Sequence, residues 1–169
     1  MYGLGDDNYL RFIKHLPKTC KSHDTKTCGL HIHVNRNSMT GNDVLKINYF
    51  VYSHQSKFEK LGRREWNTYC HADYGYEYRT DTFEYGHNER YKAVNLVNGS
   101  KVEFRFFKGT LKVSTIKASI CLVAALCEIV PQMTWEEVKS NESFDNFVRT
   151  IKADKKLTTL STYLRKKGF

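Results

Sequence analysis

Two histidines placed two residues apart are the first groups in this chain that could do chemistry. His31 and His33 alternate with the apolar residues Leu30, Ile32 and Val34, and this alternation predicts a β-strand. Side chains at positions i and i+2 share one face of a strand, so both imidazoles point the same way and the apolar residues face a core. Paired imidazoles are costly to bury without partners, which favours a site open to a ligand.

A second alternating pair supplies groups that could stand opposite the histidines. Glu103 and Arg105 lie two residues apart in another strand-like stretch, and Phe107 is expected on their face. Imidazole and carboxylate together suit a divalent cation such as Mg²⁺, with His31 and Glu103 as candidate ligands, while arginine suits a phosphate. The alternative left open is a structural glutamate–arginine pair beside two hydrogen-bonded histidines.

A zinc site and a cysteine nucleophile fit the spacing less well. Cys28, His31, His33, Cys70 and His71 are zinc-ligand types, but Cys28 is offset from the histidine face and Cys70-His71 is not a zinc-knuckle pattern. Adjacent residues on an extended chain point apart, which disfavours Cys70 as a nucleophile activated by His71. An odd number of cysteines, five, without Cys-x-x-Cys indicates free thiols in a cytoplasmic protein.

The charge of the chain favours an anionic partner. With 27 Lys and Arg against 18 Asp and Glu, the net charge is +9, which suits RNA, a nucleoprotein or a phosphate ligand; the alternative is an ordinary solvated basic surface. No membrane partner is expected, because the longest apolar run, Ile120–Val130, is short and contains Glu128.

Several basic residues are candidates for phosphate contacts, although those of the C-terminal tail also fit a solvated helical face. The candidates are Arg63, Arg64, Arg90, Lys108, Lys155, Lys156, Arg165, Lys166 and Lys167. The aromatic residues between 69 and 85, Tyr69 among them, could stack on bases, but we expect them to pack on one another within a long loop.

The elements that must position these residues begin with helices around the histidine strand. One helix is expected over 8–16 and ends before Pro17. A longer helix is expected from about Asp43 to Leu61, ended by Gly62.

The second half of the expected sheet follows a long irregular segment. Residues 63–89 are aromatic and charged, as in a functional lid. A strand over 90–97 should then form a hairpin through a two-residue turn at Asn98-Gly99 with a returning strand over 101–107.

The remaining chain is predicted to be helical. A long apolar helix over about 114–129, a capping box at Thr134 and two amphipathic patterns follow. The fold class is therefore α+β: a small antiparallel sheet packed against several helices, with an α+β domain over 1–133 and a helical extension over 134–169.

Three blocks of this chain also resemble the amidoligases of the carboxylate–amine ligase superfamily. They are Cys28–Val34, Arg90–Leu96 and Val102–Leu111, in the order that the family has them. The resemblance implies half of a glutamine synthetase-like funnel lined by the two polar strands. It further implies that His31 and Glu103 help hold Mg²⁺, with His33 and Arg105 near ATP phosphates or an acyl phosphate.

The chain departs from that family ahead of the histidine strand. The paired glutamates of the family are not found there, and the only acids are Asp6, Asp7 and Asp24, whereas ligation needs several carboxylates around its metals. We therefore expect a truncated protein of phage or mobile-element type that engages RNA or a host nucleoprotein, such as an RNA-guided nuclease.

The expected chemistry is cleavage of RNA by the two polar strands. His31 and His33 would act as base and acid, with Glu103 and Arg105 beside them. The alternative is an ATP- and Mg²⁺-dependent amide ligase whose missing half comes from another chain, a second copy or a longer native protein.

Overall fold

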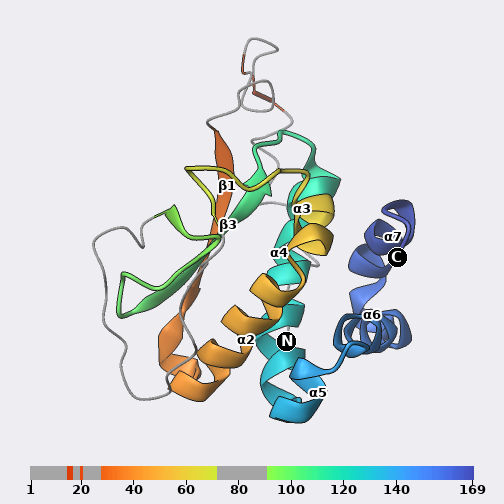
Figure 1. Ribbon diagram of the computed structural model, residues 1–169. Helices are drawn as coiled ribbons and strands as arrows, with labels where there is room; N and C mark the ends of the chain where they lie inside the picture. The colour runs from red at the N-terminus through yellow and green to blue at the C-terminus, as the bar shows by residue number, and fades with distance from the viewer. Residues whose placement is uncertain (1–14, 17–19, 21–27, 72–90) are drawn as a thin grey trace.

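A three-stranded antiparallel sheet with helices on one side forms the fold (Figure 1). The computed structural model describes residues 15–16, 20, 28–71 and 91–169. The predicted helix over 8–16 and most of the expected lid lie outside the described residues. The predicted α+β class, with a small antiparallel sheet and a helical C-terminal region, is confirmed.

The two predicted polar strands are neighbours in the sheet. Strand β1 (Gly29–Asn35) pairs with the central strand β3 (Lys101–Lys108), which also pairs with the short β2 (Val94–Asn95). His33 lies directly opposite Glu103, and directly opposed residues share a face. The pairing therefore puts both polar pairs on the face turned away from the helices.

A β-bulge interrupts this pairing where His31 faces β3. The register changes between the pairs Leu30–Phe107 and Ile32–Phe104, so His31 stands opposite two residues of β3 instead of one. The extra residue reverses the alternation beyond it, and Phe107 is fully buried like Phe104. The expectation that Phe107 shares the polar face was wrong, because simple alternation does not anticipate a bulge.

The predicted helix from Asp43 to Leu61 is in fact two helices. Helix α2 (Gly41–Ser53) begins with a capping box between Thr40 and Asp43, and α3 (Gln55–Gly62) follows after a break at His54. At the break the Nδ1 atom of His54 lies 2.8 Å from the carbonyl oxygen of Phe50, the acceptor that the backbone of residue 54 would use in a continuous helix.

The end of α3 packs unusually close to the bulge. A Cβ atom on Gly62 would lie 2.0 Å from the carbonyl oxygen of Phe106, so only glycine fits there. Gly62 is the last helical residue, and Arg63 at the C-cap takes the left-handed conformation with φ 58°. The glycine thus serves close packing, whereas the sequence predicted a cap.

The hairpin between β2 and β3 exists but is not the predicted two-residue turn. The loop spans 96–100; the amide of Lys101 donates to the carbonyl of Asn98, and the side chain of Asn98 accepts from the amide of Ser100. Gly99 has no positive φ, so this is not the mirror-image turn that Asn-Gly favours. Strand β2 is also shorter than the predicted 90–97.

A long apolar helix closes the core of the domain. Helix α4 (Val113–Ile129) runs on through the 3₁₀ turn η4 (Val130–Gln132). By length and composition Val113–Gln132 could cross a membrane, contrary to the expectation from the sequence, but the buried core helix of a globular protein passes the same test. Here Leu122 and Leu126 are fully buried in the core shared with the sheet.

Short helices complete the chain and add to the same core. They are α5 (Trp135–Lys139), α6 (Ser143–Ala153), the 3₁₀ turn η5 (Lys155–Leu157) and α7 (Thr158–Lys166). The predicted capping box at Thr134 opens α5. Phe144 and Phe147 of α6 pack on Phe50 with ring centroids 6.3 and 5.2 Å away, so the C-terminal region is joined to the first helices through aromatic contacts.

Candidate functional site

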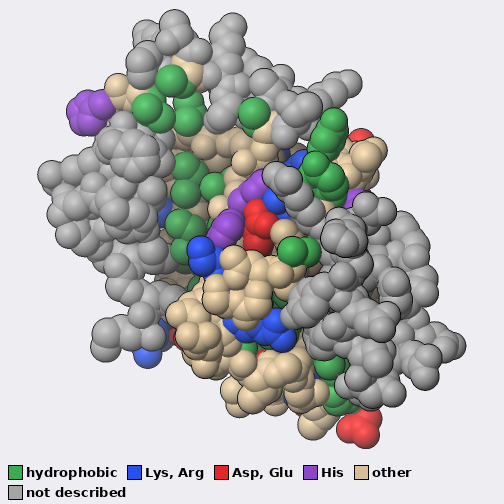
Figure 2. All heavy atoms as spheres, turned by 90° about the vertical axis from the view of Figure 1, so that its left-hand side faces the viewer, with side chains coloured by type: hydrophobic (Ala, Val, Ile, Leu, Met, Phe, Trp, Pro, Cys, Tyr) green, Lys and Arg blue, Asp and Glu red, His purple; other side chains and the backbone are tan. Residues whose placement is uncertain are grey.

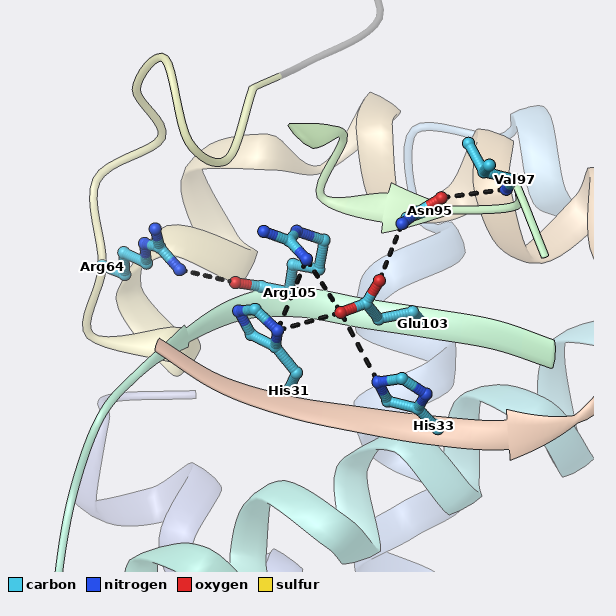
Figure 3. A network of polar contacts seen from close by, with 7 residues as sticks. All are labelled: His31, His33, Arg64, Asn95, Val97, Glu103 and Arg105. Carbon is cyan, nitrogen blue, oxygen red and sulfur yellow. Dashed lines mark hydrogen bonds and ion pairs between the residues drawn. The ribbon is translucent and has the colours of Figure 1, made fainter. Parts of the chain in front are cut away.

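The polar face of the sheet gathers one cluster of side chains from all three strands (Figure 3). His31 and His33 come from β1, Glu103 and Arg105 from β3, and Asn95 from β2. Figure 2 looks at this side of the molecule, where histidine, acidic and basic side chains meet near the centre. The four residues that the sequence singled out for chemistry are therefore brought together.

Glu103 is the centre of the cluster. Its Oε1 atom lies 2.8 Å from Nη1 of Arg105, 2.9 Å from Nδ1 of His31 and 3.5 Å from Nε2 of His33. Its Oε2 atom accepts a hydrogen bond of 2.7 Å from the side-chain amide of Asn95. With its side chain only 14% exposed, the carboxylate is a fixed acceptor around which the other groups are oriented.

The environment of His31 favours a neutral imidazole. Partial burial lowers the pKa of His31, and the positive charges of Arg105 and Arg64 and the neighbouring His33 lower it further, against the opposing effect of Glu103. The short contact to a carboxylate oxygen, which can only accept, assigns the ring proton to Nδ1. The Nε2 atom is then the basic nitrogen, and no described residue is hydrogen-bonded to it.

Gly29 opens the space that Nε2 of His31 faces. A Cβ atom on Gly29 would lie 3.1 Å from this nitrogen and 2.5 Å from Nη1 of Arg64. Arg64 is held there by a hydrogen bond of 2.9 Å to the carbonyl oxygen of Arg105. The absence of a side chain at residue 29 therefore lets a guanidinium group and a basic imidazole nitrogen approach one spot.

Only some of the predicted phosphate contacts belong to this cluster. Arg64 joins it, and Lys108 lies opposite Gly29 on the same face. Arg63 does not join it: its side chain donates to the carbonyl of Lys108 and lies against Tyr163 of α7. Because the backbone of Arg63 is left-handed, the side chains of Arg63 and Arg64 point in different directions.

The C-terminal basic residues lie away from the site. Helix α7 stands on the far side of the helical layer from the sheet (Figure 1). Lys167 has its pKa lowered by partial burial and by Arg63 and Lys60, which places it beside those cations. Five predicted contacts are thus not brought to the histidines: Lys155, Lys156, Arg165, Lys166 and Lys167. Arg90 lies outside the described residues.

Metal chemistry has no ready set of ligands in the described part of the chain. No three or more His, Cys, Asp or Glu side chains are grouped to hold a metal ion there. At Glu103, the arginine and the asparagine already occupy both carboxylate oxygens. Binding of Mg²⁺ or ATP by His31 and Glu103 stays a prediction. Cys70 is buried, which raises its pKa to about 11, so this thiol is a poor nucleophile.

Two tyrosines and an asparagine belong to this face without having been assigned to the site from the sequence. Asn95 holds Glu103, and Tyr91 lies with its ring centroid 5.8 Å from Cζ of Arg105. Tyr69 contacts Tyr91 edge to face. For Tyr91 and Asn95 the sequence held a usable signal. In the predicted strand over 90–97 both have odd numbers, whereas the apolar residues 94 and 96 have even numbers, so alternation would put the two groups on opposite faces.

No protein-family model, curated protein or solved structure matches the chain. The resemblance to amidoligases, with the funnel and the ligase activity that it implies, stays a prediction based on the three sequence blocks.

Proposed function

We propose that this protein binds RNA and cleaves its phosphodiester bonds without a metal ion, through His31, His33, Glu103 and Arg105. The observation that carries the proposal is the 2.9 Å contact between Nδ1 of His31 and Oε1 of Glu103. It orients a neutral imidazole so that Nε2 is available as a base beside two arginines. Base, acid and cationic groups are what metal-independent phosphoryl transfer requires.

In the proposed reaction His31 removes the proton of a ribose 2′-hydroxyl. The 2′-oxygen attacks the adjacent phosphorus, the bond from phosphorus to the 5′-oxygen breaks, and protonated His33 gives its proton to that leaving oxygen. The products are a 2′,3′-cyclic phosphate and a 5′-hydroxyl. Solvent then returns His31 and His33 to their starting protonation states.

The arrangement of the face fits this division of roles. Oε1 of Glu103 lies between the two imidazoles, so the phosphate would approach from the open side of the sheet, where Nε2 of His31 and Nη1 of Arg64 come near one spot beside Gly29. The side chains of His31 and His33 are 33% and 49% exposed, so both can reach a ligand. Arg105 and Arg64 are placed to stabilise the negative charge that grows on the phosphate oxygens.

Arg105, paired with Glu103 at the centre of the cluster, favours an anion over a cation as ligand. A Mg²⁺ ion bound to Glu103 would have to displace Arg105 or share the carboxylate with its positive charge. The net charge of +9 favours a polyanion as well. RNA within a host nucleoprotein remains an expected form of the target, as it was from the sequence.

The test is cleavage of a labelled single-stranded RNA by the purified chain in EDTA. We expect shortened products that end in a 2′,3′-cyclic phosphate, and no cleavage of the same oligonucleotide with one 2′-deoxy position at the cleaved site. His31→Ala and His33→Ala should each abolish cleavage, whereas His15→Ala, at an exposed histidine outside the cluster, should not. Absence of both RNA binding and cleavage at moderate salt, or a strict need for Mg²⁺, contradicts the proposal.

A further inference from the structure

The exposed aromatic side chains among the described residues lie together beside the candidate site. Tyr69 is 48% and Tyr91 37% exposed, while the large phenylalanines are buried. Their ring centroids are 5.8 Å apart at an interplanar angle of 88°. We call Tyr69 and Tyr91 the tyrosine pair.

The sheet fixes Tyr91 next to Arg105. The amide of Arg105 donates to the carbonyl of Ala93 at 2.8 Å, so the backbone contact between the two chain segments continues beyond the Val94 end of β2. Two residues after Ala93, the side-chain amide of Asn95 donates to Glu103. The ring of Tyr91 lies 5.8 Å from Cζ of Arg105, within the range of a cation–π contact.

A tight turn holds Tyr69 against its neighbour. The backbones of Asn67 and Cys70 are hydrogen-bonded to each other in both directions, and the side chain of Asn67 accepts from the amide of Tyr69 at 2.9 Å. The buried Cys70 anchors the turn, and the amide of His71 donates to the carbonyl of Tyr91. The exposed ring of Tyr69 is thus presented on a supported turn.

From this placement we propose that the tyrosine pair stacks on an unpaired base next to the phosphate held by Arg105, so that the substrate is single-stranded RNA. This inference rests on the proposed function, because it places the phosphate at Arg105. A supported aromatic ring stacks on any base, which gives affinity without sequence preference. In a duplex the bases are already paired and stacked, so the ring has no face to meet.

The alternative is that the two rings only pack on each other. In that case Tyr69→Ala would lower the stability of the fold, and any effect of the substitution on RNA binding would be the same whether or not the RNA carries the base. Stacking instead predicts that loss of the ring and loss of the base have the same effect, so that the two losses together are no worse than one. A double-mutant cycle separates these outcomes.

The experiment measures the Kd of the non-cleaving His31→Ala chain for an RNA and for the same RNA with one abasic nucleotide next to the cleaved position. We expect Tyr69→Ala to weaken binding of the intact single strand by about tenfold, with Tyr69→Trp close to the parent. For the abasic RNA and for a duplex of the same sequence, Tyr69→Ala should have no effect. Val97→Ala, at another exposed hydrophobic residue, is the control.

Equal weakening for single strand and duplex, additive effects of Tyr69→Ala and the abasic site, or no effect at all would overturn the inference. If the unsubstituted chain cleaves RNA while Tyr69→Ala binds normally, the proposed function stands and the tyrosine pair has no role in binding. If single strands bind in a ring-dependent way but are never cut, the binding inference stands and the cleavage proposal fails. If no RNA binds at all, both are wrong.

Discussion

Glu103 and His31 come from strands that are far apart in the sequence, yet Oε1 of the one lies 2.9 Å from Nδ1 of the other. The same oxygen is 2.8 Å from Nη1 of Arg105. The imidazole is therefore subject to two opposing charges, a carboxylate that favours its protonated form and a guanidinium that disfavours it. Burial and the cations prevail, since the pKa of His31 lies below its ordinary value.

Substitution of Glu103 and substitution of Arg105 should move the pKa of His31 in opposite directions. Glu103→Gln removes the group that raises the pKa of His31, so the pKa should fall further below 6.5; Arg105→Gln removes a group that lowers it, so the pKa should rise. NMR titration of the His31 ring measures both. Shifts in the same direction, or no shift in either variant, would show that the ring is not coupled to these side chains in solution.

The proposed base predicts the acidic limb of a pH–rate profile. Neutral His31 is the active form of the base, so cleavage should be lost on the acidic side as the pH falls through the lowered pKa of His31, below 6.5. In Glu103→Gln the midpoint of this limb should shift to lower pH, and the maximal rate should fall about 100-fold. An acidic limb centred above pH 6.5 contradicts His31 as the base.

The composition of the site was predictable because it follows from strand alternation. His31 and His33 on one strand and Glu103 and Arg105 on another could be expected to share faces from their spacing alone. The bulge opposite His31 was not predictable from the sequence. Val102, Phe104 and Phe106 alternate with polar residues as in a regular strand, and the extra residue changes only the face on which Phe107 lies. Divergence of Arg63 and Arg64 depends on one left-handed residue, which no pattern of residue types specifies.

Gly62 connects the fold to the site, and its substitution should affect both. Gly62→Ala would put a Cβ atom 2.0 Å from the carbonyl oxygen of Phe106 in the bulge, so stability should fall by about 1–3 kcal/mol or more and cleavage should weaken. The control is Gly41→Ala, where a Cβ would meet nothing within 4 Å. Urea unfolding measures both, and equal stability of the two variants would contradict the close packing.

Elements with strong patterns were predictable, whereas breaks within them were not. The apolar spacing of Leu45, Tyr49, Tyr52 and Phe58 correctly predicted helix on both sides of His54. The break depends on the side chain of His54 taking the carbonyl of Phe50, a local competition that helical periodicity does not report. Strand β2 covers only Val94–Asn95; in the residues just before it, the carbonyl of Tyr91 and the amide of Ala93 are hydrogen-bonded to the backbone of His71.

The buried Lys46 should stabilise the end of the long apolar helix. Its Nζ atom donates to the carbonyl oxygens of Pro131 and Met133 at 3.0 and 2.5 Å. Lys46→Met keeps the apolar stem but leaves both acceptors without this donor, so the free energy of unfolding should fall by about 1–3 kcal/mol. The exposed Lys152→Met should change it by less than about 0.5 kcal/mol. Matching urea midpoints for the two variants would show that Lys46 is dispensable.

His54 should make the stability of the fold depend on pH. Burial lowers the pKa of His54 below 6.5, and its Nε2 atom lies 3.1 Å from the hydroxyl of the buried Ser143. The unfolded chain then binds more protons than the folded chain below about pH 6.5, so stability is complete above that pH and decreases as the pH falls toward the folded pKa.

The measurement is urea unfolding of the unsubstituted chain and of His54→Asn between pH 5 and 8. The variant should be less stable at pH 8, because it loses the contacts to Phe50 and Ser143, but its stability should fall less between pH 6.5 and 5. His15→Asn, at an exposed residue, should keep the full pH dependence. An unchanged slope in His54→Asn would assign the pH dependence to other groups, of which His31, also with a lowered pKa, is the first to test.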